Sequence, residues 1–333
     1  MTKEKKTMQY PPFLKPNDTI GVSAPSAGVG RKLESFDHSL TVLKRLWRIK
    51  ETGSVRVNAV RSADAGTRAE EFCSLFPDPE VSAVMCAAGG DFLYEILPYI
   101  DWNTITAHPK WIMGASDPTS LLFTATVKYD IATLYGHNAG SFDMIPFHRS
   151  LEDCLQILQG NLITQISNDL ISSDPPFSDG PLHFDQPSRW NGPEELHVSG
   201  RCIGGCIDVL KDLIGTPYAA VDTFLDRYPD ERTIWYFDDF ALSAETFYLT
   251  LLQMKYAGWF RNTAAVIIGR VILPSSNTGM TYAEAADLAL QDIPHYTEAD
   301  IGHTPGAMTM INGAVMNLDV FQGKAHISFE LRS

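Results

Sequence analysis

Reactive side chains follow short apolar runs at three places in this sequence. The stretch WIMGASDPTSLLF, residues 111–123, places Ser116 in a small-residue turn between an apolar run and a run with helical character. In α/β folds such a junction presents a side chain at the carboxyl end of a strand. Ser116 is therefore either a nucleophile that a base activates or an ordinary cap of the following helix.

A glycine pair ends the preceding apolar run, VSAVMCAAGG. Gly89 and Gly90 are followed by Asp91. Glycines at such a position let backbone amides approach a ligand, as in an oxyanion hole, although a plain tight turn has the same sequence. Because neighbouring parallel strands end at one edge of a sheet, we expect these amides to lie close to the serine turn.

A nucleophilic serine needs a base, and the base needs an acidic partner that fixes its tautomer. His303 lies in the Gly/Pro-bounded stretch ADIGHTPGAMTMINGA, and His137 follows another apolar run in YGHNAG. Both histidines are candidates for the base. Asp238 and Asp239 end the apolar run of WYFDDF, where one carboxylate can orient the base and the other can cap the next helix.

These positions require a sheet that brings several strand ends together. Strand-like runs alternate with helix-like runs through the first half of the chain, which predicts right-handed βαβ units and a parallel sheet covered on both faces. The strand-like runs are DTIGVSAPS, SVRVNAV, VSAVMCAAGG, KWIMG and IATLYGHN, and the clearest helix-like runs are SFDHSLTVLKRLW and TSLLFTATVKY.

The composition changes between residues 166 and 200, where Pro, Ser, Asp and Gly are frequent and no periodicity is visible. Such a stretch predicts a linker or a substrate loop. We therefore expect an α/β protein with an N-terminal parallel-sheet domain over residues 1–165 and a β-rich C-terminal domain over residues 201–333. The first domain would carry the serine, and the second would carry the acid and the histidine.

The bulk composition excludes several classes of function. The 333 residues carry a formal net charge of -14, which argues against non-specific binding to nucleic acid or to an anionic membrane. The five cysteines include no C-x-x-C pair, so we expect no metal site, and no cofactor motif is apparent. Neither a signal peptide nor a membrane-spanning run is visible, and we expect a cytoplasmic protein.

Six segments, taken in order, resemble the LD-carboxypeptidase family of serine peptidases, including its microcin-immunity branch. Each motif is weak alone, and their order along nearly the whole chain carries the resemblance. The segments are NDTIGVSAPS, DPEVSAVMCAAGGDFLYEILPYIDW, GASDPTSLL, GRCIGGCIDVLKDLIGTPY, WYFDDF with the helix and strand after it, and GHTPGAMTMINGAVMNLD.

The resemblance implies a Ser-His-acid triad shared between two domains. Ser116 would be the nucleophile and His303 the general base, with the backbone amides of Gly90 and Asp117 forming the oxyanion hole. The family's glutamate is replaced here by Asp238, which is one methylene shorter. Aspartate serves histidine well in other triads, so the role is chemically possible.

Two further departures from the family pattern bear on the substrate. Cys206 stands where the family has asparagine after a Gly-Gly pair, and Ala88 replaces an arginine often found before the other Gly-Gly turn. The replacement of the arginine by Ala88 places the chain nearer the microcin-immunity branch. The substrate would be a small peptide or a peptidyl-nucleotide, cleaved either at an L–D bond of a muropeptide or at an aminoacyl amide of a nucleotide-like moiety.

Gly89, His137, Trp190 and Asp239 are the residues that we expect to contact the substrate. Trp190, together with Phe184, lies in the irregular 166–200 segment, where an aromatic side chain could stack on a base. The resemblance also implies a homodimer. The alternative function, motivated by the shorter acid and by Cys206, is a catalytically weakened homologue that binds a small ligand without turning it over.

Overall fold

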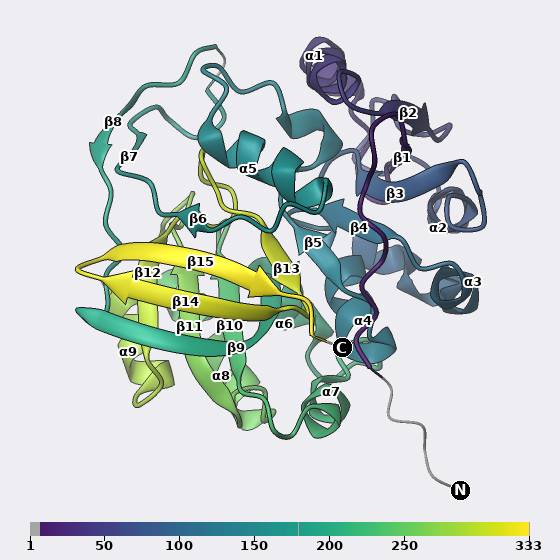
Figure 1. Cartoon of the computed structure of the whole chain (residues 1–333). Coiled ribbons are helices and arrows are strands. Elements are labelled where there is room, and N and C mark those ends of the chain that lie inside the picture. The colour runs from purple at the N-terminus through teal and green to yellow at the C-terminus, as the bar shows by residue number, and fades with distance from the viewer. Residues whose placement is uncertain (1–6, 179, 333) are drawn as a thin grey trace, which may run out of the picture.

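The computed structural model describes residues 7–178 and 180–332. Two large sheets lie side by side, and helices cover them (Figure 1). The first sheet belongs mainly to the N-terminal half of the chain and the second to the C-terminal half. The α/β fold class that the sequence predicts is confirmed. No helix within the described ranges is both long and apolar enough to cross a membrane.

The first sheet has six strands in the order β13-β5-β4-β3-β1-β2. The five N-terminal strands run parallel, and β13 is antiparallel to β5. All residues of β1, β4 and β5 are buried, which explains why these runs are apolar throughout. The strands are β1 (Thr19–Ser23), β2 (Arg48–Glu51), β3 (Val81–Cys86), β4 (Trp111–Gly114), β5 (Thr133–Tyr135) and β13 (Met310–Asn312).

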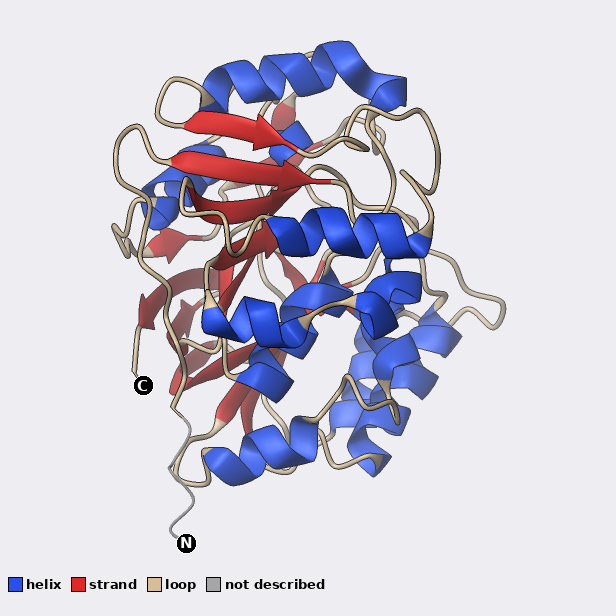
Figure 2. Ribbon diagram, turned by 90° about the vertical axis from the view of Figure 1, so that its right-hand side faces the viewer, coloured by secondary structure: helices blue, strands red, loops and turns tan. Residues whose placement is uncertain are grey.

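Helices connect these strands, and in Figure 2 they lie above and below the strands at the top of the view. The helix predicted from SFDHSLTVLKRLW is α1, and the one predicted from TSLLFTATVKY is α4. The helix α4 is buried from Thr119 to Val127, because it contacts both sheets. The helices of this half are η1 (Gly30–Lys32), α1 (Leu33–Leu43), α2 (Ala65–Ser74), η2 (Leu93–Tyr99), α3 (Trp102–Ala107), α4 (Thr119–Tyr129), η3 (Ala139–Ser141) and α5 (Arg149–Leu158).

The second strand lies earlier than the alternating run SVRVNAV predicts. It spans Arg48–Glu51, and residues 54–60 form turns and bends instead. Val55 is fully buried, and its carbonyl accepts the N–H of Val29 at 2.9 Å. Val57 and Val60 are exposed, so the alternation of this run does not correspond to one buried face.

The second sheet has seven strands in the order β12-β11-β10-β9-β14-β15-β6. Strands β9 to β12 run parallel, and β14, β15 and β6 add an antiparallel part. The strands are β6 (Gln165–Ile166), β9 (Glu195–Cys206), β10 (Thr233–Asp238), β11 (Thr263–Gly269), β12 (His295–Ala299), β14 (Val315–Phe321) and β15 (Lys324–Glu330), and the helices are α6 (Ile207–Leu213), α7 (Val221–Arg227), α8 (Ala244–Tyr256) and α9 (Tyr282–Leu290).

Each sheet receives one strand from the other half of the chain. Strand β6 pairs with β15, and β13 pairs with β5. Asn312, at the end of β13, accepts the Gly204 N–H at 3.1 Å and the Tyr236 hydroxyl at 3.0 Å, so it links the two sheets. The chain thus crosses between the sheets more than once, and the division into domains at residues 166–200 stays a prediction.

The 166–200 segment is partly ordered into a hairpin of β7 (Leu170–Ser172) and β8 (Phe184–Pro187). The residues just before and just after this hairpin bond to the buried carboxylate of Asp300. Asp300 Oδ2 accepts the Asn168 N–H at 2.9 Å and the Trp190 indole N–H at 3.1 Å. Arg270 balances this carboxylate with an ion pair of 2.5 Å.

Candidate active site

Ser116 lies in a strained turn at the end of β4. Its φ is +69°, a left-handed conformation that is uncommon for a residue with a side chain and clusters at functional sites. The Ser116 carbonyl accepts the Thr119 N–H at 2.9 Å, which closes the turn into α4. The structure thus has the sharp strand–turn–helix junction that a nucleophilic serine requires.

Asn138 and Gly89 fix the surroundings of this turn. The Asn138 side chain bonds both backbone groups of Ala115, accepting its N–H at 3.1 Å and donating to its carbonyl at 3.2 Å. Gly89 lies directly beside Ser116, where a Cβ on residue 89 would come within 2.9 Å of the serine Cβ. Only glycine lets the two strand ends approach this closely.

Two backbone amides next to the serine are free to bind a ligand. Gly90 and Asp117 line the same cavity as Ser116. Within the described part of the chain, neither of their N–H groups donates to a protein acceptor. The Asp117 side chain is buried and accepts bonds from the Ser26 hydroxyl and, at 2.8 Å, from the Leu93 N–H. This carboxylate ties the serine turn to the segment after the glycine pair.

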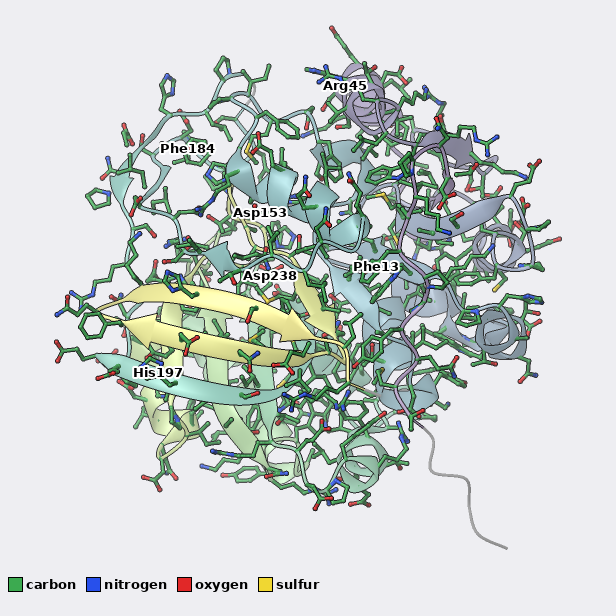
Figure 3. All side chains as sticks on the ribbon, viewed as in Figure 1. Phe13, Arg45, Asp153, Phe184, His197 and Asp238 are labelled. Atoms are coloured by element: carbon green, nitrogen blue, oxygen red, sulfur yellow. The ribbon has the colours of Figure 1, made fainter. Side chains whose placement is uncertain are left out.

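Asp238 and His303 lie close together at the end of the second sheet. Asp238 is fully buried, and its Oδ2 lies 2.8 Å from His303 Nδ1, with the ring turned off the straight N–H···O line. Asp238 Oδ1 accepts the His303 N–H at 3.2 Å. Figure 3 labels Asp238 near the middle of the molecule, well away from the outer loops. These contacts fit an acid that orients a histidine.

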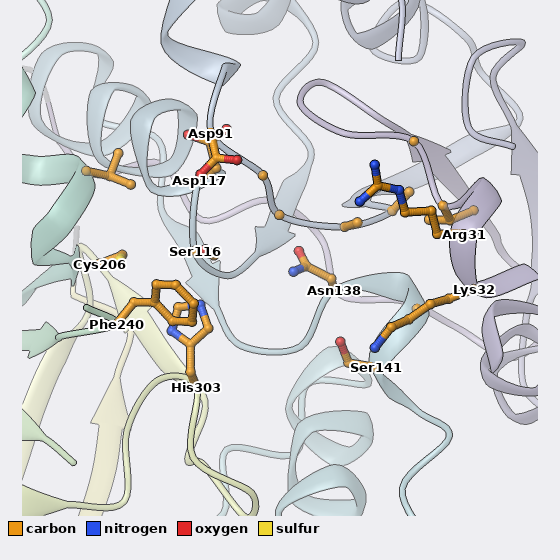
Figure 4. A pocket seen from close by; sticks show the side chains of 18 of the residues that line it. Arg31, Lys32, Asp91, Ser116, Asp117, Asn138, Ser141, Cys206, Phe240 and His303 are labelled. Carbon is orange, nitrogen blue, oxygen red and sulfur yellow. The ribbon is translucent and has the colours of Figure 1, made fainter. Parts of the chain in front are cut away.

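The histidine reaches the same cavity as the serine. His303 and Ser116 both line it, and Figure 4 shows them with Phe240, whose ring centre lies 4.7 Å from that of the imidazole. Burial lowers the pKa of His303. The charge and hydrogen bond of Asp238, together with the negative charge of Asp208, raise this pKa by more than burial lowers it. The net effect is a pKa above the usual value for histidine.

Gly302 lets the histidine loop approach the acid. Its φ is +90°, and a Cβ at this position would overlap the Asp238 carboxylate. Tyr135, at the end of β5, completes the environment of the acid. Its hydroxyl donates to Asp238 Oδ2 and accepts the Ser116 N–H at 3.1 Å.

The structure separates Asp239 and His137 from the cavity, although we expected both to contact the substrate. Asp239 is fully buried and accepts the Leu242 N–H at 3.0 Å, as a cap of the turn before α8. Burial, with the charge of Asp208, raises its pKa to about 8. Burial lowers the pKa of His137 to about 4, so its ring is neutral. The next residue, Asn138, lines the cavity instead.

Trp190 is also in a different place from the one expected. It is 1% exposed and bonded to Asp300, so its ring is part of the core rather than free to stack on a ligand. Phe184 stacks on His148 at 4.7 Å between ring centres and does not line the cavity. The aromatic residue that this segment does bring to the cavity is Phe177, which is 60% exposed and packs against Phe240.

The cavity has a volume of about 790 Å³ and charged walls. Arg31, Lys32 and Asp208 are among the lining residues, and Figure 4 labels the two cations away from His303. Sequence reasoning missed these residues, along with Tyr135 and Phe240. Only Asn138 had a signal, since it follows an apolar run in YGHNAG.

Comparisons with known proteins show the family to which the chain belongs. A family model described as the LD-carboxypeptidase N-terminal domain matches residues 20–136, and one described as the LD-carboxypeptidase C-terminal domain matches residues 199–318. The chain belongs to the LD-carboxypeptidase family. The resemblance seen in the sequence is confirmed, and the chain is a hydrolase, a serine-type carboxypeptidase.

Two relatives and one solved structure illustrate the two branches of the family. The microcin C7 self-immunity protein MccF of Escherichia coli is 25% identical over 326 residues, covering 91% of this chain and 90% of that protein. The murein tetrapeptide carboxypeptidase of Pseudomonas aeruginosa is 26% identical over 185 residues, covering 51% of this chain and 56% of that protein. The structure of MccF in complex with glutamyl sulfamoyl guanosine has a TM-score of 0.81 at 23% identity, over 96% of this chain and 98% of that one.

Proposed function

We propose that this LD-carboxypeptidase family member hydrolyses an amide bond through an acyl-enzyme on Ser116. His303 takes the proton of the Ser116 hydroxyl as its oxygen attacks the carbonyl carbon, and Asp238 stabilises the imidazolium that forms. The N–H groups of Gly90 and Asp117 stabilise the oxyanion. His303 then protonates the leaving amine, and water hydrolyses the ester with His303 again as base.

One observation carries this proposal: a serine in a left-handed turn shares a cavity with a histidine that is paired to a buried carboxylate. The two free amides beside the serine supply the remaining component of acyl transfer. Each of these groups serves a separate step of the reaction, so their convergence on one cavity favours catalysis over ligand binding alone.

We favour an aminoacyl or peptidyl nucleotide analogue as the substrate. Phe177 presents an exposed aromatic face at the cavity, where a nucleobase can stack on it. MccF, in the solved complex, holds glutamyl sulfamoyl guanosine. The volume of about 790 Å³ leaves room for a ligand of this size.

A muropeptide tetrapeptide is the second candidate, supported by the cationic wall. Arg31 and Lys32 line the cavity, and an arginine or lysine side chain can bind the free carboxylate that a carboxypeptidase substrate carries. The murein tetrapeptide carboxypeptidase relative is named for such a substrate. A homodimer and a cytoplasmic location stay predictions.

Mass spectrometry of product formation tests these alternatives. Wild type and Ser116→Ala would each be incubated with an aminoacyl sulfamoyl adenylate and with a muropeptide tetrapeptide ending in D-alanine. We expect wild type to cleave the adenylate analogue and Ser116→Ala to cleave neither compound. Cleavage of the muropeptide alone would assign the second candidate. Equal inactivity of both proteins, with ligand binding retained, would support the weakened homologue.

Phe177 provides the test of substrate class within the site. Phe177→Ala should raise KM for the adenylate analogue roughly tenfold, because stacking contributes on the order of 1–3 kcal/mol per base. Phe184→Ala is the matched control, since that ring lies in the same segment and stacks on His148 instead. Equal KM values for the two variants would contradict the stacking role.

A further inference from the structure

Tyr135 lies where the two halves of the site meet. It is 2% exposed at the end of β5 in the first sheet, and it does not line the cavity. Its hydroxyl accepts the Ser116 N–H at 3.1 Å and donates to Asp238 Oδ2, at the end of β10 in the second sheet. One buried hydroxyl therefore connects the backbone of the nucleophile to the carboxylate of the acid.

We infer that Tyr135 is a positioning residue, which holds Asp238 toward His303 and fixes the turn of Ser116. The inference rests on the proposed function, because it assigns a role within the same reaction. Tyr135 is separated from the substrate cavity, so its effect on catalysis must pass through the residues that it contacts.

The donors around Asp238 show why this hydroxyl is needed. Asp238 Oδ1 accepts the His303 backbone N–H, while Oδ2 faces both His303 Nδ1 and the Tyr135 hydroxyl. Without Tyr135, His303 Nδ1 would be the one remaining side-chain partner of Oδ2 among the described residues. The Ser116 N–H would also lose its acceptor inside a strained turn, and leaving such a group unpaired is costly.

The hydroxyl also moderates the charge that His303 experiences. A bond donated to a carboxylate disperses part of its negative charge, so removing the donor leaves more charge to stabilise the imidazolium. The other titratable groups near this network are Asp208 on α6, buried Asp239, Cys206 and Tyr236. Burial raises the pKa of the Cys206 thiol and keeps it neutral, and the Tyr236 hydroxyl bonds Asn312. None of them replaces the lost donor, so we expect the pKa of His303 to rise.

The test compares Tyr135→Phe with Tyr236→Phe. Tyr236 is a matched control because it is equally buried, its ring centre lies 5.6 Å from that of Tyr135, and its hydroxyl bonds Asn312 instead of the triad. We expect Tyr135→Phe to lower kcat roughly tenfold, the effect of losing one bond to a charged group, with KM changed less than about threefold.

The pH dependence separates positioning from a general structural role. His303 acts as a base only when neutral, so a raised pKa moves the acidic limb of kcat/KM to higher pH. In Tyr135→Phe we expect this limb, and the NMR titration of the His303 ring, to move upward by about half a pH unit or more. If Tyr135→Phe matches Tyr236→Phe in rate and titration, the inference is overturned.

The double variant Asp238→Asn with Tyr135→Phe tests whether Tyr135 affects kcat through the Asp238 carboxylate. If Tyr135 acts through the carboxylate, adding Tyr135→Phe to Asp238→Asn should lower kcat by less than about threefold. A full tenfold loss there would contradict that route. The NMR titration needs no turnover, so it can test the positioning role of Tyr135 even if the proposed hydrolytic function is wrong. A wild type without activity but with a shifted titration in Tyr135→Phe refutes the proposed function alone.

Discussion

Asp238 is one methylene shorter than the glutamate that the family resemblance leads us to expect, and its Oδ2 still lies 2.8 Å from His303 Nδ1. The histidine loop lies close to this shorter acid, and the His303 backbone N–H also bonds Asp238 at 3.2 Å. The carboxylate is fully buried among its donors. We therefore expect a site that is built around aspartate.

Asp238→Glu should lower kcat roughly tenfold or more, because an added methylene would push the carboxylate into the histidine loop. Steady-state kinetics on the substrate identified for the wild type would measure the change. A variant more active than the wild type would show instead that the shortened acid is a defect, and would support the weakened homologue.

Asp239 should make the protein less stable as the pH rises. Its pKa is about 8 in the folded protein, against an ordinary value near 3.8, so the folded state binds the extra proton between these two values. The free energy of unfolding then falls as the pH rises, by at most about 1.4 kcal/mol per pH unit from this group. Asp239→Asn, which resembles the protonated form, should remove that dependence.

Urea unfolding of Asp239→Asn and wild type at pH 6, 7 and 8 would measure the difference. We expect the stability of the variant relative to the wild type to grow over this range. A constant difference would mean that Asp239 is already ionised at pH 6.

Residue-scale reasoning from the sequence identified groups at strand ends and missed those that depend on packing between the sheets. Ser116, Gly89 and Gly90 are visible because small residues interrupt apolar runs. Tyr135 is not, since nothing in TLYGHN indicates that its hydroxyl meets a carboxylate from another sheet. Trp190 was expected at the cavity, and the structure places it in the core, bonded to Asp300 110 residues away, a contact that the local sequence does not indicate.

The loop before His303 is the element on which the geometry of the site depends most. Gly302 adopts a left-handed conformation, and a Cβ on it would overlap the Asp238 carboxylate. Gly302→Ala should therefore displace His303 and lower kcat by more than about tenfold, with little effect on KM.

Gly279→Ala is the control for backbone strain. Gly279 has a similar φ of +84°, and no atom lies within 4 Å of the Cβ that alanine would add. Gly279→Ala should lose roughly 1 kcal/mol of stability from backbone strain alone, while keeping its activity. Kinetics and thermal unfolding of both variants would separate the two effects, and full activity in Gly302→Ala would contradict the role of the close approach.

The predicted elements agree with the structure where the sequence has a clear helix-like run, as in α1 and α4, or a continuous apolar run, as in β4 and β10. They fail at residues 54–60, which alternate like a strand but form a loop in which Val55 is buried and Val57 and Val60 are exposed. The 166–200 segment was expected to be irregular, and its hairpin of β7 and β8 gives only a weak sequence signal because the strands are short and largely exposed.

At the scale of the molecule, the exchange of β6 and β13 joins the two sheets into one structure. The buried helix α4 contacts both sheets, and Asn312 bonds strands of the second sheet from its place in the first. The sequence predicted the two-part α/β organisation but not this exchange, because single short strands carry no signal of which sheet they join.

Native-state hydrogen exchange should show that the two sheets unfold together. Peptides from β4 and β10 should exchange through the same global opening, with the same free energy and denaturant dependence. Exchange of one sheet at denaturant concentrations that leave the other protected would show that each half unfolds independently.

The central claim is that Ser116 is a nucleophile that His303 activates. A fluorophosphonate reagent, which phosphonylates activated serines, followed by peptide mapping with mass spectrometry, tests it without knowledge of the natural substrate. We expect one labelled site, Ser116, with no label in Ser116→Ala and labelling slowed at least about a hundredfold in His303→Ala. Labelling of another residue, or an unlabelled Ser116 in the wild type, would contradict the account.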